Sequence, residues 1–150
     1  MAYEFKITRR VEFSETDMAG IVHYSNFFRY AEAAESAFFR SLGLSLRPPQ
    51  TEHEVGWPRV HAECDYAHPL RFEDEIEIHV LVVEKKARAI TYQFRIRKLN
   101  AQPSVEVARG KITAVCVTSD GPGKMKATPL PKAIADQIEV APAELITRAA

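Results

Sequence analysis

Residues 11–43 read VEFSETDMAGIVHYSNFFRYAEAAESAFFRSLG, and this stretch decides the fold class. Apolar side chains recur at helical spacing in its second half, at Phe27, Tyr30, Ala31, Ala34, Phe38 and Leu42. The spacing predicts an amphipathic helix over residues 25–42, about 27 Å long at 1.5 Å per residue. Ser25 or Asn26 can cap its start, and Gly43 stands just past its end. Such a helix needs a broad apolar surface to cover.

Segments that alternate apolar and polar residues predict the strands that supply this surface. They cover residues 3–13, 59–66, 75–83, 89–97 and 104–118. Strict alternation is typical of antiparallel strands with one covered face. We expect a bulge at Gly110 in the last strand. Paired prolines predict a loop over residues 47–56, and residues 132–138 form an amphipathic segment that can be helical.

The order of these elements predicts an α+β fold in one domain that covers residues 1–150. One long helix wrapped by a curved antiparallel sheet of about five strands is the layered packing that the order allows. A chain of 150 residues is long enough to form a single hydrophobic core without stabilising disulfide bonds or metal ions.

The amino-acid composition limits which binding partners and which cellular compartment are expected. Twenty basic residues balance twenty acidic ones, so the net charge gives no bulk attraction to nucleic acid or to an anionic membrane. The first ten residues lack an apolar run, and we expect a cytoplasmic protein. Cys64 and Cys116 lack ligand spacing and predict buried free thiols. No metal site is expected, because there is no mutual ligand spacing among His53, His61, His68 and His79.

The stretch 11–43 closely resembles the signature of the 4-hydroxybenzoyl-CoA thioesterase family of hotdog-fold proteins. The matching elements there are Val11-Glu12-Phe13, Glu15-Thr16-Asp17, Gly20-Ile21-Val22, Tyr24, Asn26 and the helix with Glu32. Further matches are Asp65-Tyr66, His68-Pro69-Leu70, Asp74, Lys124-Met125-Lys126 and Pro129-Leu130-Pro131. The resemblance therefore spans nearly the whole chain. It implies a hotdog fold and hydrolysis of an acyl-CoA thioester to free acid and CoA, with coenzyme A as part of the substrate and no cofactor.

The resemblance makes Asp17 the catalytic carboxylate and the backbone amide of Tyr24 the donor to the thioester carbonyl. The chemistry of the residues agrees with this assignment. A carboxylate can attack the carbonyl directly or activate water, and the backbone N–H groups at a helix start lack internal partners. They can form an oxyanion hole. Standing alone, an aspartate in such a loop is more often an Asx-turn or capping residue. Glu15 is expected to have a solvated or structural role.

Three further residues are candidates for substrate binding: His23, Asn26 and Trp57. A branch of the family carries histidine where this chain has Tyr24, so the departure favours the branch that works without a histidine base. We therefore expect His23 to be a pocket or capping residue. The aromatic residues suit an apolar acyl pocket, although such residues are core in most folds. Glu32 and Glu35 are expected to be solvated or interfacial, and Arg59 and His61 to contact a polar acyl group or solvent.

The basic cluster at residues 85–88 lies at a connection between two predicted strands. Two interpretations are equally supported. It is either an ordinary charged hairpin or, as the resemblance implies, a site for the phosphates of coenzyme A, with Lys86 and Arg88 as the candidate ligands.

The resemblance also implies a homodimer or homotetramer, with active sites formed between subunits. We expect the strand over residues 75–83 or that over 89–97 to have a free edge that dimerisation covers. Two alternatives to the hydrolase stand beside it: an acyl-thioester dehydratase on the same fold, and a non-catalytic module that binds acyl-CoA or acyl-carrier protein. The chain contains no glycine-rich phosphate loop and no GxSxG elbow. The residues do not distinguish aromatic from aliphatic acyl groups.

Overall fold

The computed structural model describes residues 1–46, 55–119 and 121–150. The predicted loop over residues 47–56 therefore lies outside the described residues, apart from its last two positions. In chain order the elements are β1 (Glu4–Arg10), a short 3-10 helix (Phe13–Glu15), α1 (Asn26–Ser41), β2 (Val55–Gly56), β3 (Arg59–Tyr66), β4 (Glu75–Lys85), β5 (Ala89–Lys98), β6 (Val105–Val115), β7 (Val117–Ser119), β8 (Met125–Ala127), α2 (Lys132–Ala135) and α3 (Ala143–Ile146).

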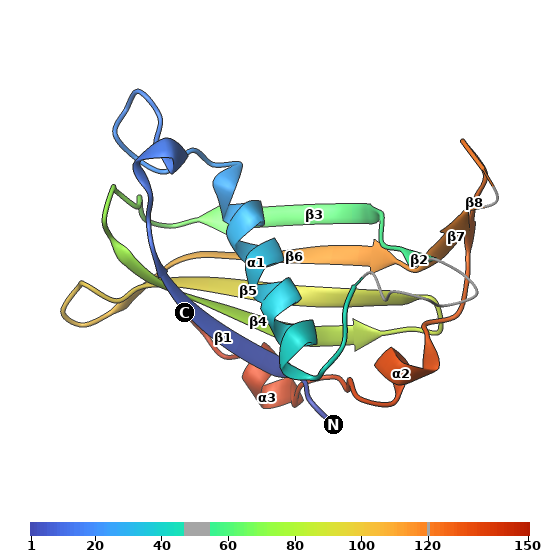
Figure 1. Ribbon diagram of the computed structural model, residues 1–150. Coiled ribbons are helices and arrows are strands. Elements are labelled where there is room, and N and C mark those ends of the chain that lie inside the picture. Colours follow the sequence, from blue (N-terminus) through green and yellow to red (C-terminus); the bar gives the residue numbers. More distant parts are fainter. Residues whose placement is uncertain (47–54, 120) are drawn as a thin grey trace.

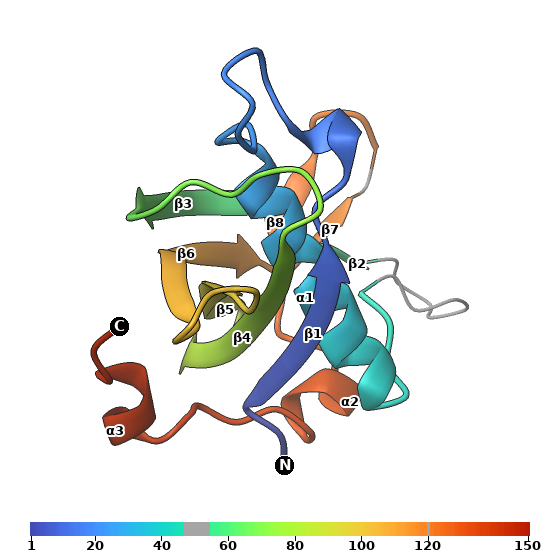
Figure 2. The same cartoon turned by 90° about the vertical axis from the view of Figure 1, so that its left-hand side faces the viewer.

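A five-stranded antiparallel sheet in the order β1-β4-β5-β6-β3 forms the body of the molecule. The sheet curves around α1, as Figures 1 and 2 show, and the core fills the space between them. This confirms the predicted α+β class and the single helix on a curved sheet. The strands β2, β7 and β8 form a second, smaller sheet.

The free edges of the large sheet are β1 and β3, so the expectation of a free edge at β4 or β5 is wrong. Both of those strands have a neighbour on each side, because the first strand of the chain pairs with β4 and the long β6 pairs with β5. Alternation reports which face of a strand is covered, but it does not report the order of the strands.

The helix α1 begins and ends close to the predicted positions, but its start is not capped as expected. Ser25 has no side-chain capping bond, and the side-chain amide of Asn26 donates instead to the carbonyl of Glu15 at 2.8 Å. The end follows the prediction. Gly43 adopts a φ of 71°, and the Leu44 N–H donates to the Phe39 carbonyl at 2.9 Å, which is the usual glycine-ended helix stop.

Gly110 lies in regular register between β5 and β3, so the predicted bulge at this position is wrong. The glycine is needed for close packing. An added Cβ would lie 2.2 Å from the Glu63 carbonyl oxygen and 2.5 Å from the Phe94 ring. The predicted long strand is interrupted at Cys116, where β6 gives way to β7.

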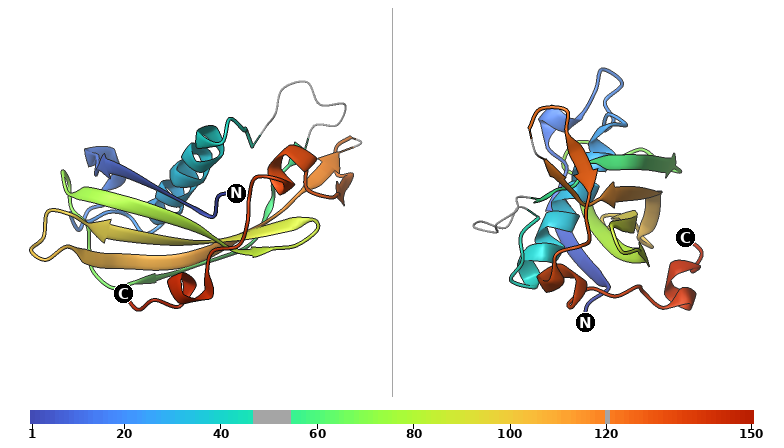
Figure 3. Two further views of the ribbon diagram at one scale, coloured as in Figure 1. Left: turned by 90° about the horizontal axis from the view of Figure 1, so that it is seen from below. Right: turned by 90° about the vertical axis from the view of Figure 1, so that its right-hand side faces the viewer.

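The C-terminal segment crosses the face of the sheet opposite α1 (Figure 3). Arg95 on β5 donates to the carbonyls of Leu145 and Ile146 at the end of α3. The predicted helix near residue 132 is present but short, and ends at Ala135. Both cysteines are free thiols, although Cys64 is only half-buried. Among the described helices, none has the length and apolar character needed to cross a membrane.

Candidate active site

Glu15 fastens the loop after β1 to the start of α1. Its carboxylate accepts hydrogen bonds from Arg9 at 2.6 Å and from the Tyr30 hydroxyl at 3.0 Å. Its carbonyl accepts from the backbone N–H of His23 at 2.9 Å as well as from Asn26. Burial and the Glu15 carboxylate both raise the pKa of Tyr30. Glu15 is therefore a structural residue, as its sequence position suggested, and it is largely shielded from solvent.

Asp17 lies at the start of a tight turn in the loop that Glu15 holds in place. The Asp17 N–H donates to the Ile21 carbonyl at 2.9 Å, and Gly20 closes the turn with a φ of 79°. The carboxylate oxygen Oδ1 accepts a hydrogen bond from the Ala19 N–H at 2.8 Å, which is an Asx-turn. The other oxygen, Oδ2, accepts none from the described part of the chain. The Asx-turn thus orients the carboxylate and leaves one oxygen available for chemistry.

A cavity of about 540 Å³ lies against this turn. It is lined by Asp17, Ile21, Val22, Tyr24, Phe27, Tyr66, Ala67, His68 and Pro69. The structure therefore brings together the two residues predicted to be catalytic, in a cavity whose walls are mainly apolar and aromatic.

Tyr24 lines the cavity and lies in the turn that precedes α1. The Asn26 N–H donates to the His23 carbonyl at 2.9 Å, and the Tyr66 hydroxyl donates to the Tyr24 carbonyl at 3.0 Å. The Tyr24 N–H itself has no acceptor within residues 1–46, 55–119 and 121–150. It lies at the positive end of a 16-residue helix, where a developing negative charge is stabilised.

Four lining residues, Tyr66 to Pro69, come from the end of β3 and the segment after it, and the sequence did not mark them as site residues. Tyr66 packs edge-on against Phe27, with ring centroids 4.9 Å apart. The motifs Asp65-Tyr66 and His68-Pro69-Leu70 belong to the family signature, and this membership is the sequence feature that could have marked them as site residues. Their alternation indicates a strand and does not reveal that this strand ends beside the Asp17 loop.

The predicted substrate-binding residues near the loop do not line this cavity. The His23 ring stacks on Tyr24, and its Nδ1 lies 2.8 Å from the Ser25 hydroxyl rather than beside a carboxylate. Asn26 is held by Glu15. Trp57 packs at the margin of the core and donates through Nε1 to the Leu46 carbonyl at 2.7 Å. Their roles in binding stay predictions.

The basic hairpin between β4 and β5 lies at the opposite end of the sheet from the loop that joins β1 to α1 (Figure 1). β4 begins beside the Asp17 loop and reaches the hairpin 11 residues later, which is about 33 Å along an extended strand. Lys86 and Arg88 are both exposed there, and Lys86 forms an ion pair with Glu84 at 2.9 Å. Within one chain these residues are far from the cavity.

Glu35 is buried, with 3% of its surface exposed, so the expectation of a solvated or interfacial charge is wrong. Its carboxylate accepts two hydrogen bonds from Arg59, whose side chain remains 31% exposed. A bulge at Val60 explains this, because one extra residue turns Arg59 onto the same face as Ala62. Burial raises the pKa of Glu35. The Tyr92 hydroxyl is buried beside the pair without meeting hydrogen-bond geometry to it.

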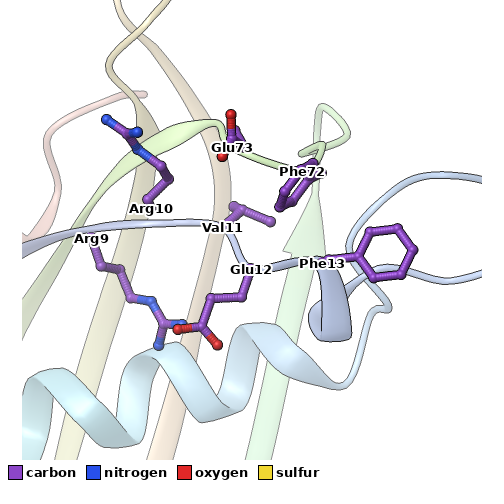
Figure 4. Close-up of a pocket in the computed structure, with 7 residues that line it drawn as sticks. All are labelled: Arg9, Arg10, Val11, Glu12, Phe13, Phe72 and Glu73. Carbon is purple, nitrogen blue, oxygen red and sulfur yellow. The ribbon is translucent and has the colours of Figure 1, made fainter.

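A second hollow of about 550 Å³ lies at the end of β1 (Figure 4). Its lining residues are Arg9, Arg10, Val11, Glu12, Phe13, Phe72 and Glu73. Both arginines are engaged in ion pairs, with Glu15 and Glu75. The exposed rings of Phe13 and Phe72 form an edge-to-face pair 5.7 Å apart at its rim. The Asp17 cavity is the better candidate site because its lining includes Asp17 and Tyr24, whose Oδ2 and backbone N–H have no hydrogen-bond partner among the described residues.

A long helix on a five-stranded antiparallel sheet, with a carboxylate loop at the helix start, defines a hotdog-fold protein of the thioesterase class. Residues 11–138 match the family model described as the thioesterase-like superfamily, and the chain belongs to that superfamily.

Known relatives agree with this assignment. A putative esterase from Aquifex aeolicus is 33% identical over 90% of this chain and 98% of its own length. A 1,4-dihydroxy-2-naphthoyl-CoA hydrolase from Rippkaea orientalis is 28% identical over 85% of this chain and 89% of its own. The solved 4-hydroxybenzoyl-CoA thioesterase from Pseudomonas sp. strain CBS-3 superposes with a TM-score of 0.76 over 89% of this chain and 99% of that one, at 23% identity. The last likeness supports the fold.

Proposed function

We propose that this thioesterase hydrolyses an acyl-CoA to the free acid and CoA, with Asp17 as its catalytic carboxylate. The observation that carries the proposal is that Asp17 and Tyr24 line the same 540 Å³ cavity, while Asp17 Oδ2 and the Tyr24 N–H have no hydrogen-bond partner in the described part of the chain. The relative whose printed name is 1,4-dihydroxy-2-naphthoyl-CoA hydrolase supports a CoA thioester as the substrate.

Two routes are consistent with this arrangement. In the first, Asp17 attacks the thioester carbonyl, the C–S bond breaks, and water then hydrolyses the resulting anhydride. In the second, Asp17 takes a proton from water as the water oxygen adds to the carbonyl, and the CoA thiol leaves with a proton. In both routes the Tyr24 N–H and the helix dipole stabilise the oxyanion. Neither route needs a cofactor.

The cavity walls suit an apolar or aromatic acyl group. Tyr24, Phe27 and Tyr66 supply aromatic surface, and Ile21 and Val22 supply aliphatic surface. We propose an acyl group of this kind, and the substrate panel described below distinguishes aromatic from aliphatic chains.

The proposed enzyme is a homodimer or a pair of such dimers. The edge strand β3 is unpaired on one side within the described chain, and Val60 and Tyr66 on it are exposed apolar residues. A second copy placed against this edge can also bring its own Lys86 and Arg88 to the coenzyme A phosphates, which the same chain's hairpin is too distant to reach. Free thiols at Cys64 and Cys116 suit a reducing, cytoplasmic setting. With zero net charge, neither nucleic acid nor membrane is proposed as a partner.

Thiol release from a panel of aromatic and aliphatic acyl-CoAs tests the proposal. We expect Asp17→Asn to lower kcat by about 10²- to 10⁴-fold, the usual range for removal of a positioned acid or base. His23→Ala should change KM more than kcat, because its ring lies against Tyr24 without entering the cavity. Asp136→Asn, just after the end of α2, is the matched control, since it makes the same chemical change at an exposed site far from the loop.

Hydrolysis by Asp17→Asn at the wild-type rate would contradict the mechanism. If the wild-type protein binds acyl-CoA but releases no thiol from any substrate, the result would support a non-catalytic binding module. Release of water from a hydroxyacyl-CoA without loss of CoA would favour the dehydratase. No described contact favours that last outcome, because His23 has no carboxylate beside it.

A further inference from the structure

Tyr66 links the edge strand of the sheet to the turn that carries the proposed oxyanion donor. It is the last residue of β3, and its hydroxyl crosses to the Tyr24 carbonyl at 3.0 Å. Its ring packs edge-on against Phe27, which fixes the direction in which the hydroxyl points. Tyr66 and Tyr24 both line the cavity that contains Asp17.

The turn before α1 is held from three directions, and Tyr66 supplies one of them. The carbonyl of Glu15 holds the N–H of His23, and the N–H of Asn26 holds the His23 carbonyl. The Tyr24 carbonyl also faces the Phe27 N–H, but at 3.4 Å that bond is long. The Tyr66 hydroxyl is therefore the better partner of the Tyr24 carbonyl.

We propose that Tyr66 is a positioning residue for the reaction: its hydroxyl fixes the backbone of Tyr24 so that the Tyr24 N–H meets the thioester carbonyl. The inference rests on the proposed function and adds to it a residue from a different part of the fold. A carbonyl and an N–H of the same residue are related by that residue's backbone dihedrals, so holding the first restrains the second.

A merely structural role for this hydrogen bond is the alternative. Tyr66 is 45% exposed within one chain, and a single neutral hydrogen bond makes only a modest net contribution to folding. Burial raises the pKa of Tyr66 to about 12, so the hydroxyl keeps its proton across the working range of pH. The hydroxyl is thus placed to orient the turn, and neither stability nor proton transfer accounts for it.

Tyr66→Phe separates these roles, because it removes the hydroxyl and keeps the ring against Phe27. We expect kcat to fall about tenfold, less than the loss of an oxyanion donor itself, with KM within about twofold of wild type. The urea midpoint and the shape of the pH–rate profile should not change. Tyr92→Phe is the matched control. It removes a phenol hydroxyl from the same sheet, but one that is buried beside Glu35, away from the turn, and meets hydrogen-bond geometry with no described residue, so kcat should stay at the wild-type value.

A second measurement does not depend on turnover. Benzoyl-CoA with a ¹³C-labelled thioester carbonyl, bound to the Asp17→Asn variant, reports polarisation of its carbonyl by a shift of the infrared stretch to lower frequency. Adding Tyr66→Phe should move that stretch back towards its value in solution. Adding Tyr92→Phe should leave it where it was.

Equal kcat and an equal carbonyl stretch with and without the Tyr66 hydroxyl would overturn the inference. So would a fall in kcat matched by a fall in the urea midpoint, which would make the bond structural, or a shifted basic limb of the pH profile, which would make Tyr66 a proton donor. If the wild-type protein releases no thiol, the proposed hydrolysis fails, and the carbonyl stretch still decides the role of Tyr66.

Discussion

His79 on β4 is a buried titratable residue on the face of the sheet opposite α1. Its Nε2 lies 2.6 Å from the Glu4 carboxylate on the neighbouring strand. Burial lowers the pKa of His79; Glu4 opposes this shift, while Lys6 and Arg95 add to it. The ring is therefore expected to be neutral in the folded protein near pH 7.

This shift predicts a loss of stability in mild acid. The unfolded chain takes up a proton on His79 near a pKa of about 6.5, while the folded protein does so only at lower pH. The stability contributed by the neutral ring is fully present above the unfolded pKa and is lost as the pH falls towards the folded one. Urea unfolding between about pH 5 and about pH 7.5 should show the wild type losing more free energy of unfolding in acid than His79→Gln, which cannot titrate. Parallel curves for the two proteins would contradict this.

The elements of this fold were predictable to different degrees because they depend on different ranges of the chain. Periodicity is local, and it predicted α1, its buried aromatic face and the five strands of the large sheet. Strand order and register are not local, so the free edges were placed on the wrong strands. The bulge at Val60, which turns Arg59 towards the buried Glu35, also left no pattern in the sequence.

Gly110 shows the same limit within one strand, since the sequence marks a glycine but does not give the reason for it. A glycine is required at this position because the neighbouring atoms leave no room for a Cβ, and this predicts the effect of a substitution in β6. Gly110→Ala should lower the free energy of unfolding by about 3 kcal/mol, at the upper end of the usual cost of overpacking, because the new Cβ meets a backbone oxygen and a buried ring. Gly56→Ala is the control, since its Cβ would meet Val117 at an ordinary 3.5 Å. Equal urea midpoints for the two variants would show that β6 moves aside at little cost.

At the scale of the whole molecule, the sequence predicted the loop that carries Asp17, but it did not predict the cavity-lining residues at the end of β3. Asp17 and Tyr24 belong to one continuous stretch whose signature is legible along the chain. The cavity is closed by residues that follow β3, and the pairing of β3 with β6 brings them to the loop. The basic hairpin could be read as a phosphate site from its charges, but its distance from Asp17 depends on the length of β4.

The distance between Asp17 and the basic hairpin predicts that a working site takes its carboxylate from one copy of the chain and its basic hairpin from another. Asp17→Asn lacks the first, and the double variant Lys86→Glu/Arg88→Glu lacks the second, so each assembly alone should hydrolyse acyl-CoA poorly. When the two are unfolded together and refolded, random pairing in a dimer leaves about one quarter of the sites with both parts intact. Activity should then recover to about that fraction of wild type. Mixing the two variants without unfolding is the control, since it leaves the original pairs in place. If refolding the mixture restores nothing, while size measurements show that mixed dimers form, the hairpin does not serve the partner's site and the coenzyme A phosphates are held elsewhere.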